Sequence, residues 1–118
     1  MYSYQTNIFL HQTSLKKHLR RVFDLNWTGY LILVAVNKIE EIDGRVATKD
    51  VIAELQLGRA WTYNAVSSLV QKGYLEIAKT KNPWRSNRLS TSVGGRIILT
   101  GAERHISERT RVKDSSLV

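Results

Sequence analysis

Residues 48–75, TKDVIAELQLGRAWTYNAVSSLVQKGYL, constrain the fold more than any other part of this 118-residue chain. Apolar side chains recur there at helical spacing in two groups separated by Gly58, which predicts two short helices joined by a tight turn. Thr48 is placed to cap the first helix and Gly73 to end the second. Residues 48–73 are therefore expected to form a helix-turn-helix. The apolar groups are Val51, Ile52 and Leu55, then Thr62, Val66, Leu69 and Val70.

The second of these helices would turn a polar face away from its apolar stripe. This face carries no carboxylate that would repel phosphate, so the helix could lie in the major groove of double-stranded DNA. Trp61 has two interpretations: it contacts a sugar or a thymine methyl group, or it packs against another part of the protein. The residues expected to contact DNA from this helix are Arg59, Trp61, Asn64, Ser67, Ser68 and Gln71.

Residues 74–91 predict a β-hairpin. The segment 74–79, YLEIAK, has strand character, a polar and basic turn surrounds Pro83, and residues 89–91 can form the return strand. Residues 45–47 can add a short strand beside it. The tip could reach the minor groove or the phosphates, or its side chains could simply be solvated. The hairpin residues expected to contact DNA are Lys79, Lys81, Trp84, Arg85, Asn87 and Arg88.

Positive charge is concentrated around this hairpin. The formal net charge of the chain is +8. Residues 72–96 hold six Lys and Arg side chains against Glu76 alone, whereas residues 38–50 are slightly acidic. A one-sided basic surface of this kind favours a polyanionic partner, with nucleic acid ahead of an acidic membrane surface.

The sequence also resembles a known family. The segment AVSSLVQKGYL, residues 65–75, is similar to the recognition-helix motif of MarR-type regulators, and TSVGGRII, residues 91–98, to the start of the helix after their wing. The resemblance covers roughly residues 15–110. It implies a mainly α (α+β) winged helix-turn-helix in which 74–91 is the wing. Two features depart from the pattern: the tip NPWRSNR, residues 82–88, lacks the Asp of the family's usual Asp-x-Arg, and the chain is short, as in SarA-type relatives.

The N-terminal third predicts an arm and two helices. Residues 1–12 are expected to be extended, and Thr13 or Ser14 could cap a helix with a basic outer face. That face could touch phosphate or could be merely solvated. Residues 27–42, capped by Asn26, are apolar nearly all round and predict a central buried helix.

Residues 92–111 have two interpretations. One is a long helix capped by Ser92, and the other is a strand over 96–100 preceded by a Gly94-Gly95 turn. We favour the helix because the resemblance places one there, with 112–118 as a tail. The resemblance further implies that the two terminal helices form a homodimer seam. The residues expected in that seam are Leu15, Leu19, Val22, Ile97, Ala102 and Ile106.

Several classes of function find no support in the sequence. The chain has no Cys, its three histidines lack metal-ligand spacing, and Gly94-Gly95 is not followed by the Lys-Ser/Thr of a phosphate loop. Its longest apolar run, residues 30–36, is too short to span a membrane, and no signal peptide is visible. We therefore expect a non-enzymatic, cytoplasmic protein of one domain, without a cofactor or metal.

Three functions remain open from the sequence. The first is a dimeric transcriptional regulator that binds a pseudo-palindrome in double-stranded DNA. The second is a DNA-binding protein of plasmid partition or replication. The third is a winged helix that serves as a protein-interaction module. Salt-dependent affinity for duplex DNA would separate the first two from the third.

Overall fold

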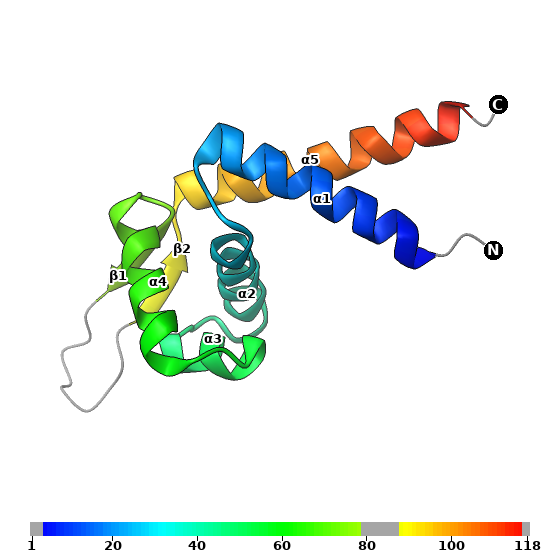
Figure 1. Cartoon of the computed structure of the whole chain (residues 1–118). Coiled ribbons are helices and arrows are strands. Elements are labelled where there is room, and N and C mark those ends of the chain that lie inside the picture. Colours follow the sequence, from blue (N-terminus) through cyan, green and yellow to red (C-terminus); the bar gives the residue numbers. More distant parts are fainter. Residues whose placement is uncertain (1–3, 79–87, 117–118) are drawn as a thin grey trace. The chain divides into compact units, whose positions relative to one another are not determined.

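A computed structural model describes residues 4–78 and 88–116 of the chain, with side chains for 12–78 and 88–107. The elements follow the order α1 (Tyr4–Phe23), α2 (Trp27–Asp43), α3 (Thr48–Leu55), α4 (Arg59–Gln71), β1 (Leu75–Ala78), β2 (Arg88–Thr91) and α5 (Val93–Ser116) (Figure 1). Contacts within the chain divide it into two compact units, Thr28–Ile97 and the pair of segments Met1–Trp27 and Ile98–Val118. None of the helices in the described ranges is both long and apolar enough to cross a membrane.

The core of the Thr28–Ile97 unit contains residues of every element in it. α2 contributes Ile32, Leu33 and Val36, which are fully buried as expected of a helix that is apolar nearly all round. The predicted stripe of α4 is buried at Thr62, Val66 and Leu69. Val51 of α3 and the hairpin residues Leu75 and Leu89 are also buried in this core.

The helix-turn-helix is present, but two of its boundary residues differ from the prediction. Thr48 is the first helical residue rather than the cap; the Asp50 carboxylate instead accepts a hydrogen bond from the Ala47 N–H at 2.9 Å. The left-handed residue in the turn is Gln56, with φ of 55°, whereas Gly58 has extended backbone and is the N-cap of α4. The bend therefore falls two residues earlier than Gly58 indicates.

α4 ends with a Schellman motif centred on Gly73. Gly73 has φ of 82°, and its N–H bonds the Val70 carbonyl while the Tyr74 N–H bonds the Leu69 carbonyl. The chain then enters β1, which pairs antiparallel with β2 in the register Leu75–Thr91 to Ala78–Arg88. The expected strand at 45–47 is reduced to a single bridge between Val46 and Leu89.

α5 is a helix and not a strand from its first residue, Val93. The Ser92 hydroxyl donates to the Gly73 carbonyl and accepts the Gly95 N–H at 3.1 Å. It thus caps α5, as predicted, and joins the start of α5 to the end of α4. α5 continues to Ser116, beyond the predicted end at residue 111.

In the second unit, the expected extended arm is wrong for residues 4–12, because α1 already begins at Tyr4. Leu15, Leu19 and Ala102 are buried within the chain itself, so these three predicted seam residues belong to its core. Ile98 takes the buried position that the sequence pattern gave to Ile97. The Ser14 hydroxyl lies 2.9 Å from His105 Nε2, which links α1 to α5.

Candidate nucleic-acid interface

The outer face of α4 is exposed and free of acidic side chains. Because Thr62, Val66 and Leu69 are buried, the helix presents the opposite face to solvent. Asn64, Ser67, Ser68 and Gln71 are all exposed on it, and Trp61 retains 48% of its accessible surface. The structure therefore places these five of the six predicted α4 residues on one exposed surface, where amide and hydroxyl groups can hydrogen-bond to base edges.

Tyr63 also belongs to this surface, although it is not among the residues predicted from the sequence. It is exposed by 40%. The Arg59 guanidinium carbon lies 6.0 Å from the centre of its ring, at the outer range of a cation–π contact. The sequence signal for this contact was the spacing of Arg59 and Tyr63, because residues four apart on a helix are neighbours.

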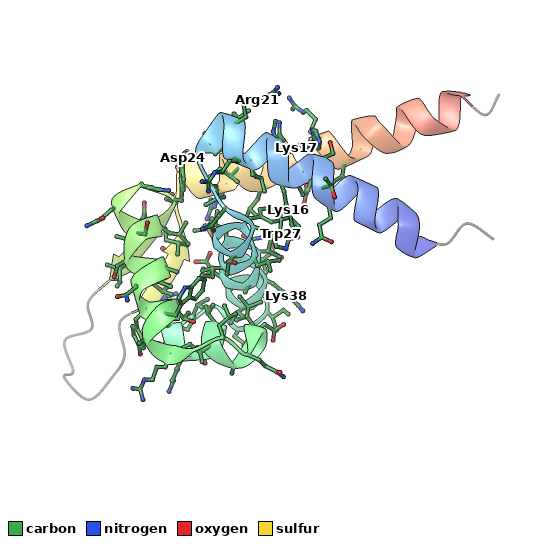
Figure 2. The ribbon with its side chains drawn as sticks, in the orientation of Figure 1. Lys16, Lys17, Arg21, Asp24, Trp27 and Lys38 are labelled. Atoms are coloured by element: carbon green, nitrogen blue, oxygen red, sulfur yellow. The ribbon has the colours of Figure 1, made fainter. Side chains whose placement is uncertain are left out.

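The two acids of α3, the helix that precedes α4, already have partners. Asp50 caps α3, as described above, and Glu54 forms an ion pair with Lys38 at 3.3 Å. That pair joins α3 to α2 (Figure 2 labels Lys38). Both side chains are well exposed, so we assign the pair little stabilisation. Its effect on the surface is to offset the negative charge of Glu54.

The hairpin contributes one described cation from the predicted set. The Arg88 guanidinium donates from Nη2 to the Gly44 carbonyl at 2.6 Å, and so ties β2 to the end of α2. The guanidinium has five N–H donors, so others remain for a second acceptor. The remaining predicted wing residues lie outside the described residues: Lys79, Lys81, Trp84, Arg85 and Asn87.

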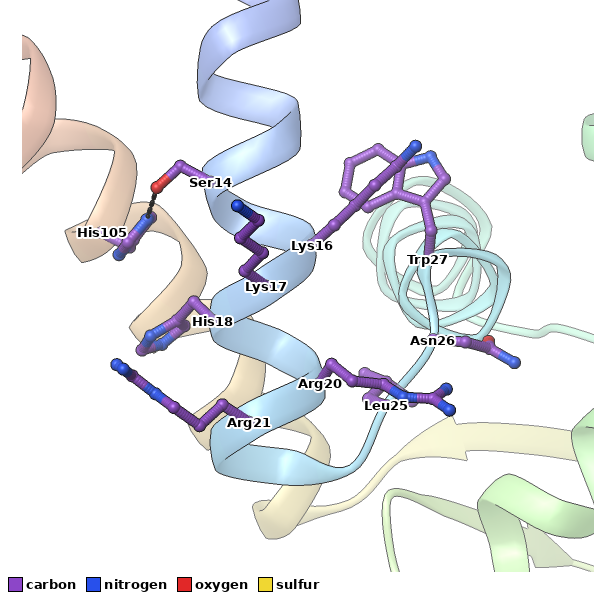
Figure 3. A pocket seen from close by; sticks show the side chains of 10 residues that line it. All are labelled: Ser14, Lys16, Lys17, His18, Arg20, Arg21, Leu25, Asn26, Trp27 and His105. Carbon is purple, nitrogen blue, oxygen red and sulfur yellow. Dashed lines mark hydrogen bonds between the residues drawn. The ribbon is translucent and has the colours of Figure 1, made fainter.

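A second basic surface lies along α1, over an open pocket of about 760 Å³. Lys16 and Arg20 point toward the turn into α2, where Lys16 Nζ lies 5.4 Å from the centre of the Trp27 ring (Figure 3). Lys17 and Arg21 lie on the flank that also carries the stacked rings of His18 and His105, whose centres are 4.6 Å apart. The residues that line the pocket include four cations and no acid.

This arrangement suits anions better than cations. The lining offers N–H donors from Lys, Arg and Asn side chains, which attract phosphate or carboxylate. Among the described residues, no three His, Asp or Glu side chains gather as they would to hold a metal ion. The basic outer face of α1 that the sequence predicts is thus present, and Figure 2 shows Lys16, Lys17 and Arg21 along it.

Comparison with known proteins identifies the fold. No family model matches the sequence, and no curated protein matches it. Among solved structures, the transcriptional regulator Tm0710 of Thermotoga maritima superposes with a TM-score of 0.79 at 16% identity, over 97% of this chain and 77% of that one. A mutant of Staphylococcus aureus MepR bound to an oligodeoxyribonucleotide gives 0.83 at 16% identity, over 100% and 85% of the two chains.

A third neighbour is a mutant of Escherichia coli MarR complexed with operator DNA, with a TM-score of 0.69 at 14% identity over 92% and 74% of the two chains. The similarity in each case extends over nearly the whole of this chain despite the low identity. It agrees with the order of helices and the two-stranded hairpin described above. The chain therefore has the winged helix-turn-helix fold of MarR-type transcriptional regulators.

Proposed function

We propose that this protein is a sequence-specific, dimeric regulator of transcription that binds double-stranded DNA in the cytoplasm. The observation that carries the proposal is the outer face of α4, which is exposed, free of acids and rich in side chains that hydrogen-bond to bases. Structural neighbours that contain DNA support it. In this proposal α4 enters the major groove and the hairpin reaches the flanking backbone.

The proposed contacts fall into two groups with different effects. Asn64, Ser67, Ser68 and Gln71 would read bases, and Trp61 would contact a sugar or a thymine methyl group. Arg88 and the wing residues Lys79, Lys81, Trp84, Arg85 and Asn87 would contact the backbone or a narrow minor groove. The net charge of +8 supports this division, because phosphate contacts supply affinity without sequence preference.

The test is to select preferred duplexes from a random pool and then measure affinity over a range of salt concentrations. Asn64→Ala should lose roughly 1–3 kcal/mol of binding free energy on the selected duplex and little on random DNA. The reason is that only the selected duplex offers the Asn64 side chain a matching base edge. Asn37→Ala makes the same chemical change on α2 and should leave both affinities unchanged.

Equal losses on selected and random DNA would contradict base reading by Asn64. A wild-type protein without salt-dependent affinity for any duplex would contradict the proposed function as a whole. A winged helix that serves as a protein-interaction module would then be the better interpretation. The position of the protected DNA distinguishes a regulator from a protein of plasmid partition or replication. A regulator should protect promoter DNA rather than a partition or origin array.

A further inference from the structure

The single cation of α4 has a defined place on the helix. Arg59 is the first residue of α4, and no other Lys or Arg occurs between it and Gln71. Within the described residues, Arg59 forms no ion pair, and its ring contact is with Tyr63 one turn later, at 6.0 Å. Both side chains are exposed. The contact is therefore a surface feature of the helix that faces solvent.

A tyrosine ring can orient an arginine and leave the hydrogen-bond donors of the guanidinium free. The five N–H groups of a guanidinium lie in its plane, so a ring near its face leaves the edge free. A carboxylate partner would instead occupy two of them. An arginine that is held in one arrangement before binding also loses less side-chain entropy when it binds.

The first turn of α4 is itself well fixed. The Thr62 hydroxyl donates to the Gly58 carbonyl at 2.7 Å, and the Thr62 N–H bonds the same oxygen at 2.9 Å. Gly58 is the N-cap of the helix. In helix-turn-helix proteins, residues at the N-terminal end of the recognition helix contact base edges, and the edge that an arginine matches in two places is guanine O6 and N7.

We propose that Arg59 reads a guanine in the major groove and that Tyr63 is a positioning residue that holds it for this contact. The inference rests on the proposed DNA binding and specifies one base of the site. It also gives different roles to Trp61 and Tyr63, the two aromatic residues near the start of α4. Residues two apart on a helix are rotated by roughly 200°, so Trp61 lies on the opposite flank of α4 from Tyr63.

The first experiment replaces each guanine of the selected duplex in turn by 7-deazaguanine, which lacks N7. At one guanine in each half of the symmetric duplex, the replacement should lower the affinity of the wild-type protein about tenfold. The same replacement should leave the affinity of Arg59→Ala unchanged. Arg59→Lys keeps the charge and should keep the salt dependence, but its preference for that guanine should be weaker, because an ammonium group lacks the rigid planar pair of N–H donors that matches O6 and N7.

The second experiment tests Tyr63 by a double-mutant cycle on the same duplex. Tyr63→Phe retains the ring and should bind like the wild type, whereas Tyr63→Leu should lose about three- to tenfold, and only when Arg59 is present. Trp61→Leu is the matched control and should not couple to Arg59. Circular dichroism should show unchanged helix content, because Tyr63 and Trp61 are both exposed.

Three outcomes would overturn the inference while DNA binding itself stands. In the first, no guanine of the selected duplex is sensitive to replacement by 7-deazaguanine. In the second, Arg59→Ala loses the same affinity on all sequences, and in the third, the effects of Tyr63→Leu and Arg59→Ala on affinity are additive. The second outcome would assign Arg59 to a phosphate. A wild-type protein that binds no duplex would overturn both the inference and the proposed function.

Discussion

At Gly95 the backbone of α5 passes so close to the start of β1 that an added Cβ would overlap the Tyr74 carbonyl oxygen and lie 2.8 Å from Thr91 Cγ2. The same glycine donates its N–H to the Ser92 hydroxyl, which in turn donates to the Gly73 carbonyl. Glycine is therefore required at residue 95 by close packing, although it weakens a helix elsewhere. Gly101, farther along α5, has no such neighbour: an added Cβ would lie 3.8 Å from Phe23, an ordinary contact.

These two glycines give a matched prediction. Gly95→Ala should lower the free energy of unfolding by about 1–3 kcal/mol, because backbone atoms would have to move. Gly101→Ala should leave it unchanged or raise it by up to about 1 kcal/mol, because alanine favours the helix. Urea unfolding followed by circular dichroism, at one protein concentration, measures both. Equal stability of Gly95→Ala and the wild type would show that α5 does not pack this closely on β1.

At the scale of elements, the turn between α3 and α4 is shaped by a residue that is not glycine. Gln56 adopts the left-handed conformation, with φ of 55°, and its N–H bonds the Ile52 carbonyl at 2.8 Å. A side chain in this conformation is strained, and helices usually place glycine there. Gly58, by contrast, has φ of −63°, which any residue adopts, and an added Cβ would lie 3.9 Å from Trp61 Cβ.

Gln56→Gly should therefore raise the free energy of unfolding by about 0.5–1 kcal/mol, since the relief of strain outweighs the added freedom of the unfolded chain. Gly58→Ala should be tolerated, with a change well below that of a core substitution. Thermal unfolding of the two variants and the wild type measures their order of stability. A less stable Gln56→Gly protein would mean that the glutamine side chain contributes more than its backbone conformation costs.

At the scale of the whole molecule, five of the six residues predicted for the dimer seam divide into two sets, whereas Ile106 is intermediate in exposure. Leu15, Leu19 and Ala102 are buried, whereas Val22 and Ile97 remain exposed by 53% and 58%. The first set stabilises the single chain. The second set is available for a partner, so we retain the predicted homodimer with Val22 and Ile97, but not the buried three, as its exposed contacts.

We expect sedimentation to show a dimer at micromolar concentration. Val22→Glu and Ile97→Glu should shift it toward monomer with little loss of helix content, because a buried charge without a partner is costly in an interface but harmless on a solvated surface. Ile42→Glu is the control: Ile42 is 71% exposed but lies at the end of α2, outside the terminal helices. A wild-type monomer, or dissociation by Ile42→Glu alone, would count against this seam.

The sequence by itself determined those parts of the fold that depend on local spacing. The two helices of the helix-turn-helix, the stripe of α4, the end at Gly73 and the hairpin all follow from periodicity and from residues with strong backbone preferences. The exposed polar face of α4 follows as well, because burying one side of a helix leaves the opposite side to solvent.

Only the tertiary structure decided features that depend on residues far apart in the chain. It buried Ile98 and left Ile97 exposed, because Ile98 lies four residues before the buried Ala102 and shares its face of α5. It joined Ser92 to Gly73 and Arg88 to Gly44, which required the register of the hairpin. It also placed the bend at Gln56, although local propensity favoured Gly58, because packing free energy summed over a core exceeds the preference of one residue.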